Sequence, residues 1–171
     1  RGPHQDPDKP LDIFAELRRA HKVLLMPNDR VGGLFLGATV YQSIRQYYPD
    51  AHISLLTDER WAPLARQIPF VDDVIVMTAT QQVWSQEFRA FVEQLRADAY
   101  DLVVCLGPDC SYRLARLCGL SGARLRVGFQ REGLDPYNVE IVRRSAGEYE
   151  SDQYQSLLRI LGLDVCGEVQ W

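Results

Sequence analysis

The sequence predicts an α/β protein with a Rossmann-like, doubly wound and mainly parallel sheet. Three observations support this fold class. Short apolar runs recur along the chain, a stretch with helical spacing follows most of them, and the runs are continuously apolar rather than alternating. A continuous apolar run is typical of a strand that is buried on both faces. With 171 residues, 46% of them apolar, the chain is long enough for one domain with a sizeable core.

Punctuating residues separate the elements of the first half. Asp12 can cap a short helix, Pro27 ends the first apolar run, and the Gly32-Gly33 pair breaks the chain before the first long helix. The predicted elements are a helix at 12–20, a strand at Lys22–Met26, a helix at Leu34–Tyr48, a strand at His52–Leu56, a helix at Asp58–Gln67 and a strand at Val74–Met77.

Helical periodicity continues in the second half, where Phe88, Phe91, Val92 and Leu95 recur at spacings of three and four. The predicted elements are a helix at Glu87–Ala97, a strand at Leu102–Leu106, a helix with Leu114 and Leu117, a strand at Leu125–Phe129, a strand at Val139–Val142 and a helix at Ser151–Leu161. We therefore expect an N-terminal extension at 1–21, a Rossmann-like domain at 22–163, and the start of a linker or tail at 164–171.

Composition excludes several classes of function. The net charge of −4 gives no reason to expect nucleic acid as a partner, and no apolar run approaches the ~20 residues of a membrane-spanning helix. The four cysteines form no CxxC pair, so we expect no metal and no cofactor, but a reducing intracellular compartment, either the cytoplasm or an organelle stroma. Because the chain begins at Arg1, we expect that upstream residues were removed, and a lost targeting segment stays open.

In a doubly wound sheet, ligands bind beyond the carboxyl ends of the strands. The loops there are predicted at Pro27–Gly33, Thr57–Arg60, Thr78–Gln82, Gly107–Ser111 and Gln130–Asn138. The candidate substrate-binding residues are Asn28, Arg30, Gly32, Gly33, Asp109, Arg113 and Arg131. The glycine pair is either a tight turn or an anion site, and both interpretations stay open.

Two further patterns have competing interpretations. The loop Val31-Gly-Gly-Leu-Phe-Leu-Gly37 does not match the GxGxxG spacing of a dinucleotide site, although Asp58 stands where a ribose-binding acid would lie. Five arginines between residues 113 and 131 could bind phosphate or an acidic partner, but a solvated, ion-paired face is the interpretation we favour. We expect Trp61 and Trp84 to be packing residues on helices; the alternative is that either of them lines a sugar or a protein contact.

Residues 22–37 (KVLLMPNDRVGGLFLG) resemble the opening of glycosyltransferase family nine, the ADP-heptose:lipopolysaccharide heptosyltransferases. The resemblance continues through Tyr48–Ile53, Pro69–Val76, Tyr100–Val104 and Arg126–Phe129, and spans about Lys22 to Leu163. It implies the N-terminal, acceptor-recognising half of a two-domain GT-B architecture. The implied partners are a nucleotide-sugar donor domain, placed after Trp171, or another protein subunit, with a glycan or glycolipid as acceptor.

The sequence departs from the family pattern where chemistry is expected. The resemblance implies that the first loop ends in Gly-Asp, whose carboxylate acts as the base, but here Gly33 follows Gly32. Pro27 replaces a basic residue, and Cys105-Leu-Gly107 replaces an Asp-x-x-Gly pattern. Asp29 is the candidate catalytic residue, but it lies four residues ahead of the missing acid. We therefore expect an acceptor-side domain that is inactive as it stands; the alternative is a non-catalytic binding or assembly subunit of a larger complex.

Overall fold

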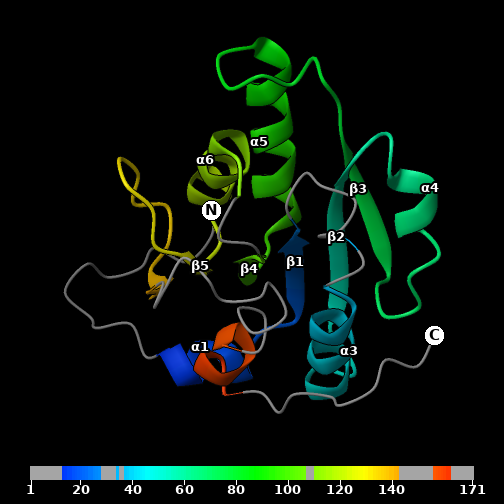
Figure 1. Ribbon diagram of the computed structural model, residues 1–171, viewed down its shortest axis with the longest axis vertical. Helices are drawn as coiled ribbons and strands as arrows, with labels where there is room; N and C mark the ends of the chain where they lie inside the picture. Colours follow the sequence, from blue (N-terminus) through cyan, green and yellow to red (C-terminus); the bar gives the residue numbers. More distant parts are fainter. Residues whose placement is uncertain (1–12, 28–33, 35–36, 107–109, 143–155, 163–171) are drawn as a thin grey trace, which may run out of the picture.

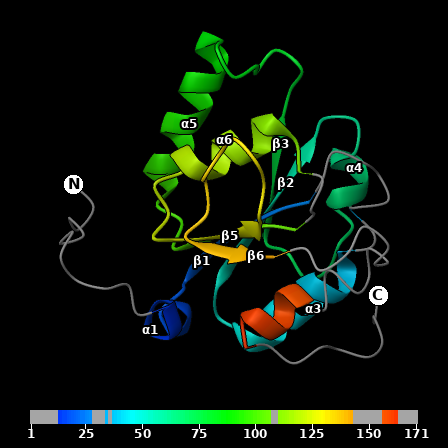
Figure 2. The ribbon, with the colours of Figure 1, turned by 60° about the vertical axis from the view of Figure 1, so that its left-hand side comes forward.

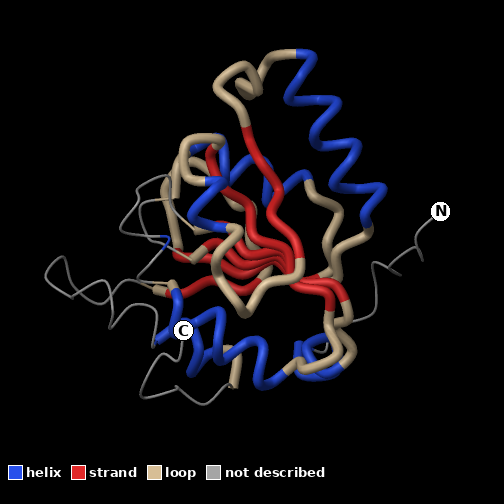
Figure 3. Tube along the Cα trace, turned by 90° about the vertical axis from the view of Figure 1, so that its right-hand side faces the viewer, coloured by secondary structure: helices blue, strands red, loops and turns tan. Residues whose placement is uncertain are grey.

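A six-stranded sheet with helices on both faces forms the domain, as Figures 1 and 3 show for this computed structural model. The structure describes residues 13–27, 34, 37–106, 110–142 and 156–162. All five strand pairings are parallel, and the strand order is β3-β2-β1-β4-β5-β6. This is the order of the Rossmann fold, so the predicted fold class is confirmed.

The strands are β1 (Lys22–Met26), β2 (His52–Asp58), β3 (Asp73–Met77), β4 (Leu102–Cys105), β5 (Leu125–Phe129) and β6 (Val139–Ile141). The helices are α1 (Ile13–Arg18), α3 (Ala38–Tyr47), α4 (Ala62–Ala65), α5 (Gln86–Asp98) and α6 (Tyr112–Leu120). Residues 156–160 are also helical. No helix of the described residues has both the length and the apolarity needed to cross a bilayer.

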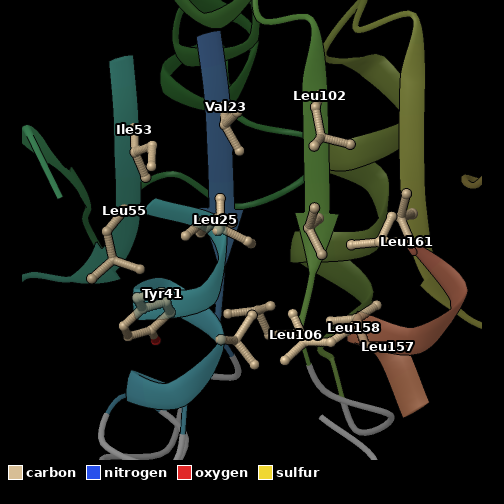
Figure 4. Close-up of a cluster of buried hydrophobic side chains, with 14 of the residues drawn as sticks. Val23, Leu25, Tyr41, Ile53, Leu55, Leu102, Leu106, Leu157, Leu158 and Leu161 are labelled. Carbon is tan, nitrogen blue, oxygen red and sulfur yellow. The ribbon is translucent and has the colours of Figure 1, made fainter. Parts of the chain in front are cut away.

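Side chains of β1 alternate between two separate cores. Val23 and Leu25 join the core beneath α1, α3 and the helical residues 156–160 (Figure 4), whereas Leu24 and Met26 join the core beneath α5 and α6. All four side chains have no exposed surface. Figure 2 shows α5 and α6 on one side of the sheet and α3 on the other. The continuous apolar run therefore reflects burial on both faces, as expected.

A loop replaces a helix between β5 and β6. Residues 130–138 contain no helix, and Tyr137 from this loop is buried in the core beneath α5 and α6. Its ring lies so close to Gly128 that a Cβ on this glycine would come within 2.4 Å of the ring. Glycine at position 128 therefore lets an aromatic side chain cover the part of β5 that a helix would otherwise cover.

The predicted helix at Asp58–Gln67 is wrong in its extent. Strand β2 continues to Asp58, which pairs with Met77, and helix α4 has only four residues. The Asp58 carboxylate accepts a hydrogen bond from the backbone N–H of Arg60 (3.0 Å) and so forms a turn instead of capping a helix. Pro63 lies in the first turn of α4, and Pro69 follows soon after its end.

Other boundaries move by a few residues. Helix α5 starts at Gln86 because the Ser85 hydroxyl accepts a hydrogen bond from the Phe88 N–H (3.0 Å). The predicted helix Leu34–Tyr48 corresponds to a helical residue at Leu34 and to α3, with a turn at Gly37. Of the predicted helix at 151–161, residues 156–160 are helical, and 151–155 lie outside the described residues.

Replacement of Leu25 by alanine should destabilise the domain strongly, because Leu25 is fully buried in the central strand. We expect the free energy of unfolding to fall by about 2–5 kcal/mol, from lost apolar burial and from the cavity left behind. Urea denaturation followed by circular dichroism measures this change. Leu64→Ala is the matched control, because Leu64 is 36% exposed on α4; a similar loss in both variants would contradict the assignment of β1 as the centre of the core.

Candidate functional site

The strand order reverses between β1 and β4, and this reversal defines the candidate site. From β1 the chain winds outward to β2 and β3, and then returns across the sheet to β4, β5 and β6. The crossovers that leave β1 and β4 therefore diverge, and in doubly wound sheets this switch point, beyond the carboxyl ends of the two strands, is where ligands bind. Leu106 donates its N–H to the carbonyl of Met26 (3.0 Å), so the two strand ends stay side by side up to the start of their loops.

Most of the sequence-predicted site residues belong to the two loops that follow β1 and β4. Pro27, the last described residue after β1, is buried. Six of the predicted site residues on these loops lie outside the described part of the chain: Asn28, Asp29, Arg30, Gly32, Gly33 and Asp109. Topology thus brings the starts of both loops to one point at the sheet edge.

Arg113 and Arg131 lie at the same edge of the sheet and hold its loops together. Arg113 Nη1, in the first turn of α6, donates to the carbonyl oxygens of Thr78 (3.0 Å) and Gln81 (3.4 Å) in the loop after β3. Arg131 Nη1, in the loop after β5, donates to the carbonyls of Cys110 (2.9 Å) and Ser111 (3.3 Å), just before α6. The two guanidinium groups therefore connect the loops that follow β3, β4 and β5.

The remaining arginines of this stretch lie elsewhere. Arg124 and Arg126 are at the start of β5, on the amino edge, where Arg126 donates to the carbonyls of Pro136 (2.9 Å) and Ala123 (2.9 Å). Arg124 forms an ion pair with Glu16 at 3.4 Å. Arg116 lies within α6. The five arginines therefore do not form one continuous basic patch, since the two edges of the sheet separate them.

Asp58, the candidate ribose-binding acid, is engaged by its own turn. Its Oδ1 accepts hydrogen bonds from Arg60 Nε (2.8 Å) and from the Arg60 backbone N–H (3.0 Å). These hydrogen bonds lower the pKa of the Asp58 carboxyl below its ordinary value. A carboxylate with these partners gives no support to the dinucleotide interpretation, in agreement with the absence of the GxGxxG pattern.

Three buried cysteines meet beside the candidate site, a contact that was not among the features predicted from the sequence. Cys105, Cys110 and Cys118 carry buried free thiols whose ionisation is coupled, and Cys105 Sγ donates a hydrogen bond to Met26 Sδ (3.9 Å). Hydrogen bonding with the Cys110 and Cys118 thiols lowers the pKa of the Cys105 thiol. The pKa of the Cys118 thiol is raised instead, first by hydrogen bonding with Cys105 and then by burial. The described residues contain no group of histidine, cysteine and acidic side chains able to hold a metal ion.

One signal for this cluster was present in the sequence. Cys110 and Cys118 are eight residues apart, about two helical turns, and Cys105 ends the preceding buried strand. A strand end next to its own helix brings such residues together. The expectation that Cys105 is a buried structural thiol is confirmed, because its side chain has no exposed surface.

The two tryptophans in the described residues differ in environment. Trp61 packs against the core at the start of α4, as expected. The expectation that Trp84 packs on a helix is wrong, because Trp84 precedes α5 in a turn and is 79% exposed. An apolar residue in or beside a helix is buried only when it lies on the side of the helix that packs against the sheet.

Arg131→Gln should loosen the loops at the candidate site. The variant loses two hydrogen bonds from a charged donor to backbone carbonyls, so we expect the free energy of unfolding to fall by about 1–3 kcal/mol. Amide hydrogen exchange in the first turn of α6 should also become faster. Arg124→Gln, which removes an ion pair at the amino edge, is the matched control and should cost about 0–1 kcal/mol. Unchanged stability in Arg131→Gln would contradict a role in holding these loops.

Asp58→Asn should change the dependence of stability on pH. The pKa of Asp58 is lower in the folded state, so its stabilisation is present above the unfolded value of about 3.9 and is lost as pH falls through the folded value. We expect the free energy of unfolding of the variant to be about 0.5–1 kcal/mol lower than that of the wild type at pH 7, and this difference to shrink from about pH 4 downward. Urea unfolding at a series of pH values measures it. Arg60→Gln keeps the backbone hydrogen bond to Asp58, so the pH-dependent part of the stability difference should be smaller for this variant. A stability difference between wild type and Asp58→Asn that stays constant down to pH 2 would exclude the titration of Asp58 as its cause.

Comparison with solved structures places this domain in a known fold. The structure of a family 9 glycosyl transferase from Veillonella parvula matches with a TM-score of 0.67 and 19% identity, covering 86% of this chain and 42% of that one. The ADP-heptose lipopolysaccharide heptosyltransferase II of E. coli matches with a TM-score of 0.67 and 24% identity over 88% of this chain and 45% of that one. The E. coli heptosyltransferase WaaC with ADP-2-deoxy-2-fluoro heptose matches with a TM-score of 0.65 and 17% identity, covering 86% of this chain and 50% of that one.

No family model matches the sequence. No curated protein matches it either. The chain spans about half the length of the glycosyltransferases it resembles in structure, which agrees with one half of a two-domain GT-B architecture. At these identities the likeness shows the fold: the described domain has the parallel α/β fold found in family 9 glycosyltransferases and heptosyltransferases.

Proposed function

We propose that this chain is the acceptor-side domain of a family-nine, heptosyltransferase-like glycosyltransferase, and that it does not catalyse sugar transfer. The observation that carries the proposal is the reversal of strand order between β1 and β4. It is the switch point of a sheet shared with heptosyltransferases, and the loop after β1 has the sequence that resembles this family.

The loop residues have the chemistry that a glycan acceptor requires. Amide, carboxylate and guanidinium groups of Asn28, Asp109 and Arg30 can hydrogen-bond to sugar hydroxyls or to phosphate. The Gly32-Gly33 pair would let a ligand approach the backbone closely. The partner in the whole protein would be a domain that binds the nucleotide sugar.

Residue 33 is the reason for proposing that the domain is inactive. Sugar transfer to a hydroxyl needs a group that accepts the hydroxyl proton, and a glycine has no side chain to do so. General-base catalysis typically contributes ~10²–10⁴-fold to the rate. Asp29 is the candidate replacement, but its position four residues upstream places it at a different point of the loop.

A second candidate function is that of a non-catalytic binding or assembly subunit in a larger protein complex. Two observations favour it: the absence of a carboxylate at position 33, and the exposed aromatic residues Trp84 and Tyr112, which lie just before α5 and at the start of α6. Enzyme scaffolds that lose their chemistry keep their surfaces, and these remain available for protein contacts.

Binding and transfer assays with the purified chain separate these proposals. We expect deacylated lipopolysaccharide core oligosaccharide to bind the chain in isothermal titration calorimetry, and ADP not to bind. Asn28→Ala and Arg30→Ala should each weaken oligosaccharide binding by about tenfold. Arg124→Gln, at the opposite edge of the sheet, is the control and should bind as the wild type does.

With ADP-heptose and the oligosaccharide both present, mass spectrometry should detect no transferred heptose, and Asp29→Ala should change nothing. Transfer that falls by about 10²-fold or more in Asp29→Ala would identify Asp29 as the base and overturn the proposed inactivity. Oligosaccharide binding that is equal in all loop variants would overturn the proposed site. No binding at all would leave the assembly subunit as the better proposal.

A further inference from the structure

We propose that the groove between α5 and α6 is a docking site for an acidic, amphipathic helix of a partner protein. The residues that line this groove belong to α5, to α6 and to the turn before α5, and none of them lies on β1 or β4. The proposal is independent of the proposed glycosyltransferase function.

Two facing stripes of residues form the groove. On α5, Phe88, Val92 and Arg96 recur at a spacing of four, and on α6 residues 112, 116 and 120 do the same. This spacing places each set on one face of its helix. Figures 1 and 2 show the two helices side by side on the same side of the sheet. The groove has a volume of about 580 Å³ and is open to solvent along its length.

Two exposed aromatic side chains stand at one end of the groove. Trp84, just before α5, is 79% exposed, and Tyr112, the first residue of α6, is 50% exposed. Both line the groove, whose floor includes the buried ring of Phe88. Nothing in the described part of this chain covers Trp84, which makes it the most exposed large apolar side chain there. Tryptophan, tyrosine and arginine are the residue types that most often dominate binding energy at protein interfaces.

The charge of the groove is opposite to that of the whole chain. Arg89, Arg96 and Arg116 line it together with one acid, Glu93, whereas the chain carries a net charge of −4. Within the described residues, the three guanidinium groups have no hydrogen bond or ion pair, and the buried Nε of Arg116 has no acceptor. A carboxylate entering the groove would supply acceptors to a charged group that lacks them, so the groove is complementary to an acidic partner.

The shape of the groove selects a helix as the occupant. The stripes span nine residues on each helix, or about 12 Å between the first and the last residue, which corresponds to two to three turns of a third helix. A helix laid between two others buries apolar residues at every third and fourth position and leaves its flanks beside the groove walls. Apolar anchors would lie between Trp84 and the floor, and flanking carboxylates would face the arginines.

The test uses a helical peptide of about 15 residues, with leucines at helical spacing and flanking glutamates, added to the purified chain. The control peptide carries lysine in place of every glutamate. We expect the acidic peptide to bind, to shift the fluorescence emission of Trp84 to the blue, and to bind more weakly as salt increases. The basic peptide should bind at least about tenfold more weakly. Trp84→Phe identifies the fluorescence signal, because the shift should disappear in this variant.

Three substitutions sharpen the test. Arg116→Gln and Arg96→Gln should each weaken binding of the acidic peptide by about tenfold, and Arg89→Gln, at an exposed position, provides a variant with little risk to folding. Arg124→Gln removes the same charge at the amino edge and should leave binding unchanged. Circular dichroism verifies that each variant folds.

The proposal is overturned if the acidic and basic peptides bind equally, or if no binding is detected up to about 1 mM peptide. It is also overturned if sedimentation shows that the chain self-associates and that Trp84→Ala abolishes this, because the groove would then be an interface between copies. Failure of this test leaves the oligosaccharide assays unaffected, since those variants lie on the loops after β1 and β4.

Discussion

Burial of β1 on both of its faces is the constraint on which the rest of the structure depends. Val23 and Leu25 face one core while Leu24 and Met26 face the other, so neither face of the central strand can remain in water. Helices must therefore cover both sides of the sheet, and parallel pairing with helical crossovers satisfies this demand. The reversal of strand order between β1 and β4 follows from the same constraint, because the chain must wind in both directions from the centre to complete two layers of helices.

Arginine is the principal cation of this chain, with 17 arginines against 2 lysines, and several of its guanidinium groups bind backbone carbonyls. Arg45 shows the pattern at the amino edge, where it donates to the carbonyls of Phe70 (3.0 Å) and Ala51 (2.8 Å) and pairs with Asp72. A planar fork of donors can join two loops at once, which a lysine cannot do with the same geometry. The chain thus uses charge to hold irregular segments that have no apolar side to bury.

Fold and chemistry separate clearly in this domain. The fold matches that of glycosyltransferase structures with TM-scores of 0.65–0.67, although the sequences are only 17–24% identical. The chemistry expected of such a scaffold depends on single side chains in loops, and Gly33 has none to offer. Likeness of fold alone therefore does not establish a chemistry, which has to be argued from the residues of the site. Surfaces such as the α5–α6 groove do not depend on that chemistry.

The sequence by itself determined the fold class and most of the element positions, because the apolar runs and the helical spacing report burial locally. It determined the loops of the candidate site as well, since a strand's carboxyl end can be located without knowing its neighbours. Only the tertiary structure decided which strands are adjacent, how Arg113 and Arg131 are used, and that Cys105 meets Cys110 and Cys118. It also decided that Trp84 lies exposed beside a groove and that β2 extends through Asp58 at the expense of α4. The strand neighbours and the contacts of the two arginines join segments far apart in the chain, and a local pattern of residue types carries little information about such contacts.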